Sequence, residues 1–138
     1  MANKIAVVTG GAGGIGQAVV TRLAQSGFAV CIVDQNEKAG QDLVELMRQE
    51  KYHGEFYQVE LKRAAEIKGL FERIYAKFQR IDVLVNLAGG TLHKHPITEF
   101  PLSEWREVID VNLKATFLCC QAVSQHMREA KSGAIINT

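Results

Sequence analysis

The sequence is poor in cysteine and proline and has no long apolar run. Its three cysteines form no Cys-x-x-Cys pair and are odd in number, so we expect reduced thiols that pack among apolar side chains. Both prolines fall within residues 89–102, which predicts a loop there. The apolar stretch at residues 81–92 is interrupted by Asp82 and Asn86 and is shorter than the roughly 18 residues needed to cross a bilayer. No membrane span is therefore expected.

An excess of charge of either sign is also missing. Lysine and arginine number 16 against 15 acidic residues, interspersed along the chain, for a formal net charge of +1. This balance argues against a surface that binds nucleic acid or anionic membranes, and it favours a small-molecule partner. The first four residues lead straight into an apolar segment and leave no room for a secretory leader, which predicts a cytoplasmic protein.

What the sequence does contain is an alternation of short β-branched runs with longer amphipathic segments. With 47% hydrophobic and 22% charged residues, it has the composition of one globular domain. We expect strands at residues 4–9, 28–33, 55–59, 81–86 and 134–137. Amphipathic helices are expected between them, one with Asn36 as its N-cap and a long one with Ser103 as its N-cap.

Strands that alternate with helices are typical of βαβ units around a parallel sheet. The most economical arrangement is a Rossmann-like doubly wound α/β domain over residues 1–138, with three α/β/α layers and strand order 3-2-1-4-5. Sheets of this kind normally have a sixth strand, so the fifth would be left as an open apolar edge. We therefore expect a domain that is truncated after the fifth strand.

A glycine-rich segment, residues 9–16, joins the first expected strand to the first helix. It fits both the general G-x-G-x-x-G pattern and the pattern T-G-x-x-x-G-x-G. Glycine there lets a diphosphate approach backbone N–H groups at the positive end of the helix. No Gly-Lys-Ser or Gly-Lys-Thr follows, which excludes a P-loop. The candidate binding residues are Thr9, Gly10, Gly13, Gly14, Ile15 and Gly16. The alternative is a flexible turn without a ligand.

Asp34 directly follows the second expected strand, eighteen residues after Gly16. A dinucleotide-binding fold places a carboxylate here to accept hydrogen bonds from the adenosine ribose hydroxyls. The same carboxylate would repel the 2′-phosphate of NADP, and residues 10–16 contain no lysine or arginine to compensate. NAD is therefore the expected cofactor, with NADP less favoured. The alternative is an aspartate that only caps or turns the chain.

Four ordered segments together resemble the short-chain dehydrogenase/reductase family. They are the glycine-rich segment, residues 86–89 (Asn-Leu-Ala-Gly), residues 111–113 (Val-Asn-Leu) and residues 133–138 (Gly-Ala-Ile-Ile-Asn-Thr). The resemblance covers essentially the whole chain. It implies a set of residues near the cofactor, namely Glu60, Leu61, Asn86, Ala88 and Gly89. Leu87 stands where the family has a second asparagine.

The resemblance also makes Asn112 a catalytic residue, as the asparagine of the family's Asn-Ser-Tyr-Lys tetrad. Considered without the family, Asn112 lies on a helical stripe with Trp105, Val108, Ile109 and Thr116 that is expected to face the core. A buried amide needs hydrogen-bond partners. The alternative is an asparagine that bonds nearby backbone and has only a structural role.

The activity implied by the resemblance is hydride transfer between a nicotinamide and a small alcohol or ketone. The family uses a tyrosine, in Tyr-x-x-x-Lys, as general acid/base. Tyr52, Tyr57 and Tyr75 each lack a lysine four residues later, so the 138-residue chain is expected to supply the cofactor side and to be inactive alone. The family's pairing of long helices implies a homodimer or homotetramer. Two alternatives stay open: a non-catalytic dinucleotide-binding module or sensor, and an S-adenosylmethionine-dependent methyltransferase.

His93 and His95 follow the glycines after the fourth expected strand and, by the resemblance, face the substrate side of the nicotinamide. Two histidines without other ligands are too few for a metal site, so no metal is expected. We interpret this segment as a solvated loop.

Overall fold

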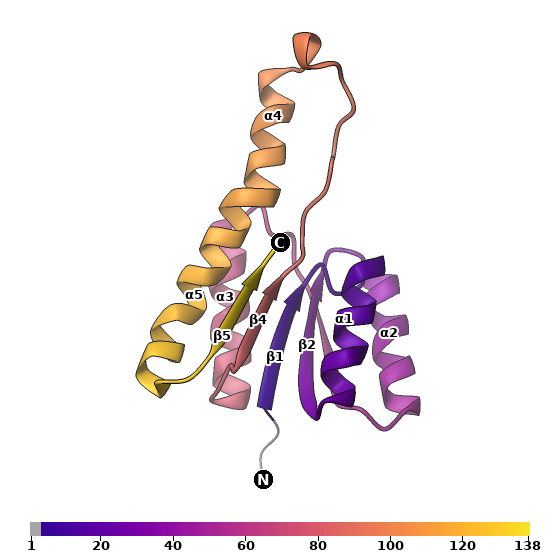
Figure 1. The fold of residues 1–138 in the computed structure, drawn as a ribbon, viewed down its shortest axis with the longest axis vertical. Helices are drawn as coiled ribbons and strands as arrows, with labels where there is room; N and C mark the ends of the chain where they lie inside the picture. Colours follow the sequence, from indigo (N-terminus) through magenta and orange to yellow (C-terminus); the bar gives the residue numbers. More distant parts are fainter. Residues whose placement is uncertain (1–3) are drawn as a thin grey trace.

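The computed structural model describes residues 4–138 as a parallel five-stranded sheet between two layers of helices (Figure 1). The strands are β1 (Lys4–Thr9), β2 (Phe28–Asp34), β3 (Gly54–Gln58), β4 (Val83–Asn86) and β5 (Ala134–Asn137). They lie in the order β3-β2-β1-β4-β5 and all neighbouring pairs are parallel. The predicted fold class and strand order are therefore confirmed. The predicted absence of a leader concerns residues 1–3, which lie outside the described part.

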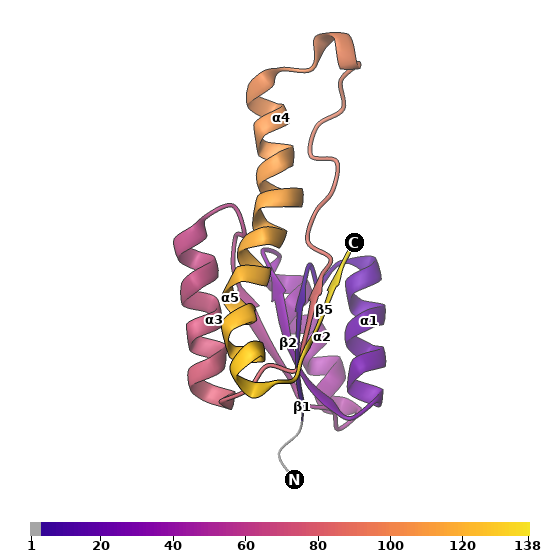
Figure 2. The same cartoon turned by 60° about the vertical axis from the view of Figure 1, so that its left-hand side comes forward.

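Helices cover both faces of the sheet. They are α1 (Gly14–Gln25), α2 (Glu37–Gln49), α3 (Ala64–Phe78), α4 (Leu102–Ile109) and α5 (Ala115–Ala130), with a 3₁₀ turn at Ile97–Glu99 before α4. Figure 2 shows α1 and α2 on one face and α3 and α5 on the other. The N-cap prediction for α2 is confirmed, because the Asn36 side chain accepts a hydrogen bond from the backbone N–H of Ala39 at 3.1 Å.

The central strand β1 shows why both faces must be covered. Val7 packs with the apolar side chains of α3 and α5, whereas Val8 packs with those of α1 and α2. Both valines have no exposed surface. Because successive strand residues point to opposite faces, a continuous apolar run gives a strand that is buried on both sides.

The long helix begins earlier than predicted. It runs without a break through α4, a π-helical segment at Asp110–Lys114 and α5. The backbone N–H of Trp105 donates to the carbonyl of Pro101 at 3.0 Å, so Pro101 is the N-cap and the prediction of Ser103 is wrong. The physical reason lies in Pro101, whose extended conformation (φ −64°, ψ 137°) is already that of a residue at the start of a helix.

Residues 90–109, which we call the projection, extend beyond the carboxyl edge of the sheet (Figures 1 and 2). Apolar side chains on it are open to solvent, with Ile97 88% and Trp105 50% exposed. The predicted core stripe of the long helix is therefore wrong for this part, because the sheet does not reach it. Farther along, in α5, the helix does pack on the sheet, since Val123 and Met127 are buried, although Phe117 is exposed.

The cysteines behave as predicted. All three are free, and Cys31 and Cys119 are buried within the apolar layer between the sheet and helices α3 and α5. Burial raises the pKa of the Cys31 thiol to about 12 and that of the Cys119 thiol to about 12. Both side chains are therefore neutral packing groups at neutral pH. In the described part of the chain, no helix combines the length and apolar character that a membrane crossing needs.

Candidate functional site

The glycine-rich segment forms a tight turn against the end of β4. Gly10 has a φ of +66°, and a Cβ added there would lie 2.8 Å from the backbone nitrogen of Ala88. A Cβ added at Gly16 would overlap the carbonyl oxygen of Gly10. Only glycine fits at these two positions, and the result is a bare backbone surface at the carboxyl edge of the sheet.

The start of α1 offers unpaired backbone donors on this surface. The first helical hydrogen bond of α1 is donated by Gln17 N–H to the carbonyl of Gly13, at 2.8 Å. Within residues 4–138, the N–H groups of Gly14, Ile15 and Gly16 have no hydrogen-bond partner. The first turn also contains no acidic side chain. Open amides at the positive end of a 12-residue helix favour an anionic ligand.

Asp34 faces the same region from the end of β2. Its Oδ2 accepts a hydrogen bond from Ala12 N–H at 3.1 Å, and its Oδ1 accepts one from Asn36 N–H at 3.0 Å. Part of the alternative interpretation is therefore correct, because the carboxylate does organise the local turn. Each oxygen nevertheless retains a free acceptor position, and Asp34 lines a cavity.

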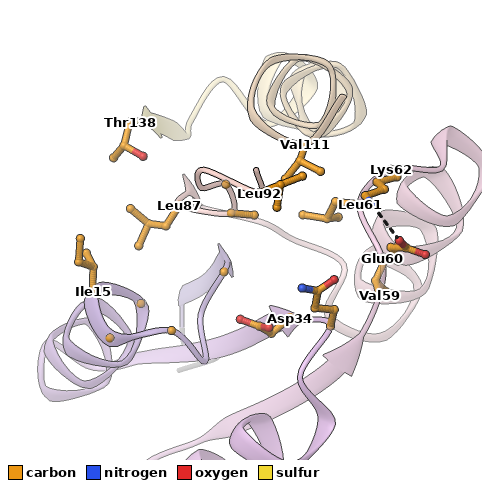
Figure 3. A pocket seen from close by; sticks show the side chains of 17 residues that line it. Ile15, Asp34, Val59, Glu60, Leu61, Lys62, Leu87, Leu92, Val111 and Thr138 are labelled. Atoms are coloured by element: carbon orange, nitrogen blue, oxygen red, sulfur yellow. Dashed lines mark ion pairs between the residues drawn. The ribbon is translucent and has the colours of Figure 1, made fainter. Parts of the chain in front are cut away.

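The cavity has a volume of about 620 Å³ and lies along the carboxyl edge of the sheet (Figure 3). Most of the predicted cofactor residues line it: Gly10, Gly13, Gly14, Ile15, Gly16, Asp34, Glu60, Leu61, Ala88 and Gly89. Segments far apart in the sequence thus meet at one site. Glu60 forms an ion pair with Lys62, in which the Nζ–Oε1 distance is 3.7 Å.

Seven further residues line the cavity without having been predicted. They are Gln35, Val59, Lys62, Leu87, Leu92, Val111 and Thr138. Gln35, Val59, Leu87 and Thr138 all lie just beyond a strand, so the rule that ligands bind at the carboxyl ends of parallel strands would have found them. Leu92 and Val111 carry no such signal, because Leu92 lies in the loop after β4 and Val111 in the π-helical segment, away from the end of a strand.

Two predicted binding residues lie beneath the cavity. Thr9 is 1% exposed, and its Oγ1 accepts a hydrogen bond from Ala88 N–H at 3.2 Å. Asn86 is 3% exposed, and its Nδ2 donates to Asn137 Oδ1 at 2.8 Å. In the structure, which describes residues 4–138, neither lines the cavity. Both hold the β4 turn in place instead.

Asn112 lies in the π-helical segment and contacts the turn after β4. Its Oδ1 accepts from Gly90 N–H at 2.9 Å, and its Nδ2 donates to the Gly90 carbonyl at 3.0 Å and to the Val108 carbonyl at 2.9 Å. The residue is exposed, so the prediction that it points into the core is wrong. Its side chain bonds backbone, as the alternative proposed, and this ties the long helix to the cavity's edge.

His93 and His95 lie in a solvated loop, but their side chains are not free. Both contact carboxylates of α4, with His93 between Glu104 and Glu107 and His95 beside Glu104. The loop is solvent-exposed as predicted, with the His93 side chain 28% and the His95 side chain 40% exposed, although both imidazoles contact carboxylates. Within residues 4–138, no group of three or more histidine, cysteine, aspartate or glutamate side chains has a geometry that could hold a metal ion.

The tyrosines lie away from the cavity. Among the described residues, no tyrosine lines it. Tyr57 donates its hydroxyl hydrogen bond to Glu55 at 2.9 Å, and burial, together with the charge of Glu55 and a neighbouring thiol, raises the pKa of Tyr57 far above its ordinary value. Tyr75 stacks on His126 at 3.7 Å between ring centroids. These side chains have structural contacts and no access to a ligand in the cavity.

A doubly wound parallel sheet with a glycine-rich turn and an acidic residue at its carboxyl edge has the arrangement of a dinucleotide-binding domain. Residues 4–138 match the sequence profile of the family described as short chain dehydrogenase, and the chain belongs to this family. The match leaves the methyltransferase alternative without support.

Two relatives show how far the similarity extends. The chain is 36% identical to D-threitol dehydrogenase of Mycolicibacterium smegmatis, covering 97% of this chain and 51% of that protein. It is 39% identical to 5-keto-D-gluconate 5-reductase of Escherichia coli, covering 99% of this chain and 54% of that protein. The chain therefore spans about half the length of the relatives it matches.

Among solved structures of similar proteins, one contains NADP and another contains NAD⁺. A metagenomic short-chain oxidoreductase in complex with NADP superposes with a TM-score of 0.93 at 31% identity, over 97% of this chain and 61% of that one. An NAD⁺-bound xylitol dehydrogenase superposes with a TM-score of 0.92 at 28% identity, over 97% of this chain and 52% of that one. The preference between the two cofactors must therefore be argued from this chain's own residues.

Proposed function

We propose that this chain supplies the cofactor-binding part of an NAD-dependent oxidoreductase that transfers hydride between a nicotinamide and a small alcohol or ketone. One observation carries the proposal: the three open amides at the start of α1 and the carboxylate of Asp34 line the same cavity. An anion site beside a hydroxyl-binding carboxylate matches the diphosphate and adenosine ribose of a dinucleotide.

The residues present fit such a ligand in size and in chemistry. A volume of about 620 Å³ is within the usual range for cofactor pockets. The amides of Gly14, Ile15 and Gly16 would hold the diphosphate, and the two oxygens of Asp34 would accept the ribose hydroxyl protons. A Cβ at Gly10 or Gly16 would collide with the backbone of the turn and displace the surface that carries these amides, which explains the glycines.

Two parts of the cavity lining suit the two bases of the dinucleotide. Leu61 and Val111 give apolar surface near Glu60, whose carboxylate can accept from an adenine amino group. Ala88 and Gly89, in the turn after β4, line the same cavity. A bound nicotinamide would supply the hydride chemistry there. Asn112 would act on this part by fixing the turn through its bonds to Gly90, and we retain it as a candidate catalytic residue on that basis.

Charge at Asp34 favours NAD over NADP. A 2′-phosphate within about 4 Å of this carboxylate would be repelled by roughly 1 to 4 kcal/mol, depending on the effective dielectric. Gln35, beside it, is neutral, and Lys62 is already paired with Glu60. A cation that could hold the phosphate is therefore not in place among the described cavity residues. A cytoplasmic location and a homodimer or homotetramer complete the proposal, and light scattering would test the assembly.

Calorimetric titration of the chain with NADH and NADPH tests the proposal. We expect NADH to bind at least about fivefold more tightly than NADPH. Asp34→Asn should weaken NADH binding by about tenfold, since a charge-assisted hydrogen bond is lost, and should bring NADPH closer to NADH. Asp42→Asn is the matched control, because this exposed aspartate of α2 lies outside the cavity and its ion pair within residues 4–138 is with Lys38. The proposal fails if the folded chain gives no heat with NADH and Asp34→Asn changes nothing.

A further inference from the structure

The projection contains a small network of histidines and carboxylates. His93 Nδ1 lies 3.0 Å from Glu104 Oε2, and His93 Nε2 lies 3.1 Å from Glu107 Oε2. His95 Nε2 lies 2.8 Å from the same Glu104 oxygen. We call these contacts the His93 clasp. They join the loop after β4 to the first two turns of α4 and leave the His93 side chain 28% exposed.

Each ring nitrogen of His93 faces a carboxylate oxygen: Nε2 is hydrogen-bonded to Glu107, and Nδ1 lies at ion-pair distance from Glu104. A neutral imidazole has one N–H, and its second nitrogen can only accept, which an ionised carboxylate cannot satisfy. The imidazolium form donates from both nitrogens and adds charge attraction to Glu104 and Glu107. Loss of the Nδ1 proton would therefore turn the close approach of Nδ1 to Glu104 Oε2 into a repulsive contact.

The other charged groups around His93 do not supply the positive charge that a protonated His93 brings to Glu104. Lys62, from the segment after β3, has its Nζ 3.9 Å from Glu107 Oε2 and 3.7 Å from Glu60 Oε1, so it is shared between two carboxylates. Within residues 4–138, the cationic partners of Glu104 are the two histidines. Lys94, between them in the sequence, is exposed and forms no ion pair in the described part of the chain.

The clasp is one residue away from the cavity wall. Leu92, which precedes His93, lines the cavity together with Val111 (Figure 3). On its other side, Gly90 is fixed to Asn112 by a pair of hydrogen bonds at 2.9 and 3.0 Å. Leu92 is thus held between two attachments to the long helix. The amide pair does not depend on pH, whereas the His93 clasp does.

We propose that His93 is a positioning residue whose protonated form holds Leu92 in the cavity wall, so that ligand binding against this wall weakens as pH rises. The proposal rests on the proposed function, because it takes the ligand to be a nicotinamide dinucleotide. Loss of the His93 contacts leaves the loop attached at Gly90 and, beyond Leu92, at His95, so Leu92, already 42% exposed, loses the attachment of the residue next to it.

NADH binding at several pH values tests the proposal, from about pH 6 to about pH 8.5, where an imidazole loses its charge. Wild type should lose affinity by about three- to tenfold across this range. His93→Gln should bind weakly at every pH, because a neutral amide cannot form the charged contacts. His93→Arg should bind tightly at every pH, because its fixed charge can donate to both carboxylates. His53→Gln, an exposed histidine before β3, should behave like wild type.

A second measurement keeps this proposal separate from the proposed function. The methyl NMR signals of Leu92 in the ligand-free chain should shift with pH in wild type and in His53→Gln, and should stay constant in both His93 variants. If NADH fails to bind at any pH, the proposed function fails and the Leu92 signals alone decide the role of His93. A pH dependence that persists in His93→Gln or His93→Arg, by either measurement, would overturn the role assigned to His93.

Discussion

The body of the molecule and its projection are stabilised by different interactions. In the body, side chains such as Val7, Val8 and Leu84 have no exposed surface and pack in two apolar layers. In the projection, residues 90–109, no residue is buried. Its order comes from the Asn112–Gly90 hydrogen bonds and the His93 clasp. The cavity lies where these two parts meet, and among its described lining residues Leu92 comes from the projection.

Because of this difference, one side of the cavity is rigid and the side with Leu92 is adjustable. Burial of apolar surface stabilises by about 25 cal/mol per Å² and does not depend on pH, so the wall with the glycine turn and Asp34 is fixed. Exposed ion pairs contribute roughly 0 to 1 kcal/mol and weaken with salt. The wall with Leu92 is therefore the adjustable one, and changes to it should alter binding more than stability.

The largest expected effect compares one leucine from each part. Leu84 of β4 has no exposed surface, whereas Leu102 of α4 is 60% exposed. Leu84→Ala should lower the free energy of unfolding by about 3 kcal/mol, because it leaves a cavity in the apolar layer. Leu102→Ala should change it by less than about 0.5 kcal/mol. Urea unfolding measures both, and equal losses would show that the projection is stabilised in the same way as the body.

A smaller effect is expected within the glycine turn. Gly16→Ala should cost about 2 kcal/mol, because the new Cβ overlaps the Gly10 carbonyl and must push α1 away from the sheet. Gly14→Ala should be neutral or slightly stabilising, since its Cβ meets no atom within 4 Å and alanine is the better helix former. Unfolding of the two variants in urea gives the comparison. Similar losses in both would mean that the turn is not tightly packed.

The sequence predicted the body far better than the projection. The apolar runs of β1 and β4 and the cap at Asn36 are local signals, and each is confirmed. Strand order followed from the crossover rules. Asp34 and the glycine turn were found because strand ends in such a sheet always meet at one edge.

The projection was mispredicted because its structure depends on distant partners. Periodicity placed Trp105 on a core stripe, yet the helix there has no sheet beside it. Nothing in the sequence indicates that His93 pairs with Glu104 and Glu107, because the contacts span the loop after β4. Leu92 enters the cavity wall for the same reason. Ser103 was favoured by its side chain, whereas the conformation of Pro101 decided where the helix begins.

The link between β1 and the β4 turn gives a third prediction. Thr9→Val removes the hydroxyl that accepts from Ala88 N–H at 3.2 Å and leaves a partly buried donor without its partner. We expect a loss of about 1 kcal/mol in the free energy of unfolding, together with weaker NADH binding, because the turn that lines the cavity loosens. Thr21→Val is the control, since that exposed hydroxyl donates within its own helix, to the carbonyl of Gln17. If the two variants behave alike, the Thr9 bond does not hold the turn.

The smallest effect is expected at the amino edge of the sheet, where the body has its own polar contact. Asp82 Oδ2 accepts from Ile5 N–H at 2.8 Å, and Arg80 donates to both carboxylate oxygens. Burial opposes the ionised form, but these hydrogen bonds and the charges of Arg80 and Lys4 outweigh it and hold the pKa of Asp82 below its ordinary value. Folding is therefore stabilised by the ionised form of this residue.

The sign of the pH effect follows from the lowered pKa. The stabilisation by Asp82 is complete above the unfolded-state pKa of about 3.9 and is lost as pH falls through the lower folded-state value. Asp82→Asn should cost about 0.5 kcal/mol at neutral pH and make the loss of stability below about pH 4 shallower than in wild type. Asp42→Asn, on the exposed face of α2, should leave the loss of stability below about pH 4 as steep as in wild type. If stability falls below about pH 4 as steeply in Asp82→Asn as in wild type, other carboxylates govern acid stability. The body would then resemble the projection in having polar contacts that contribute little to folding.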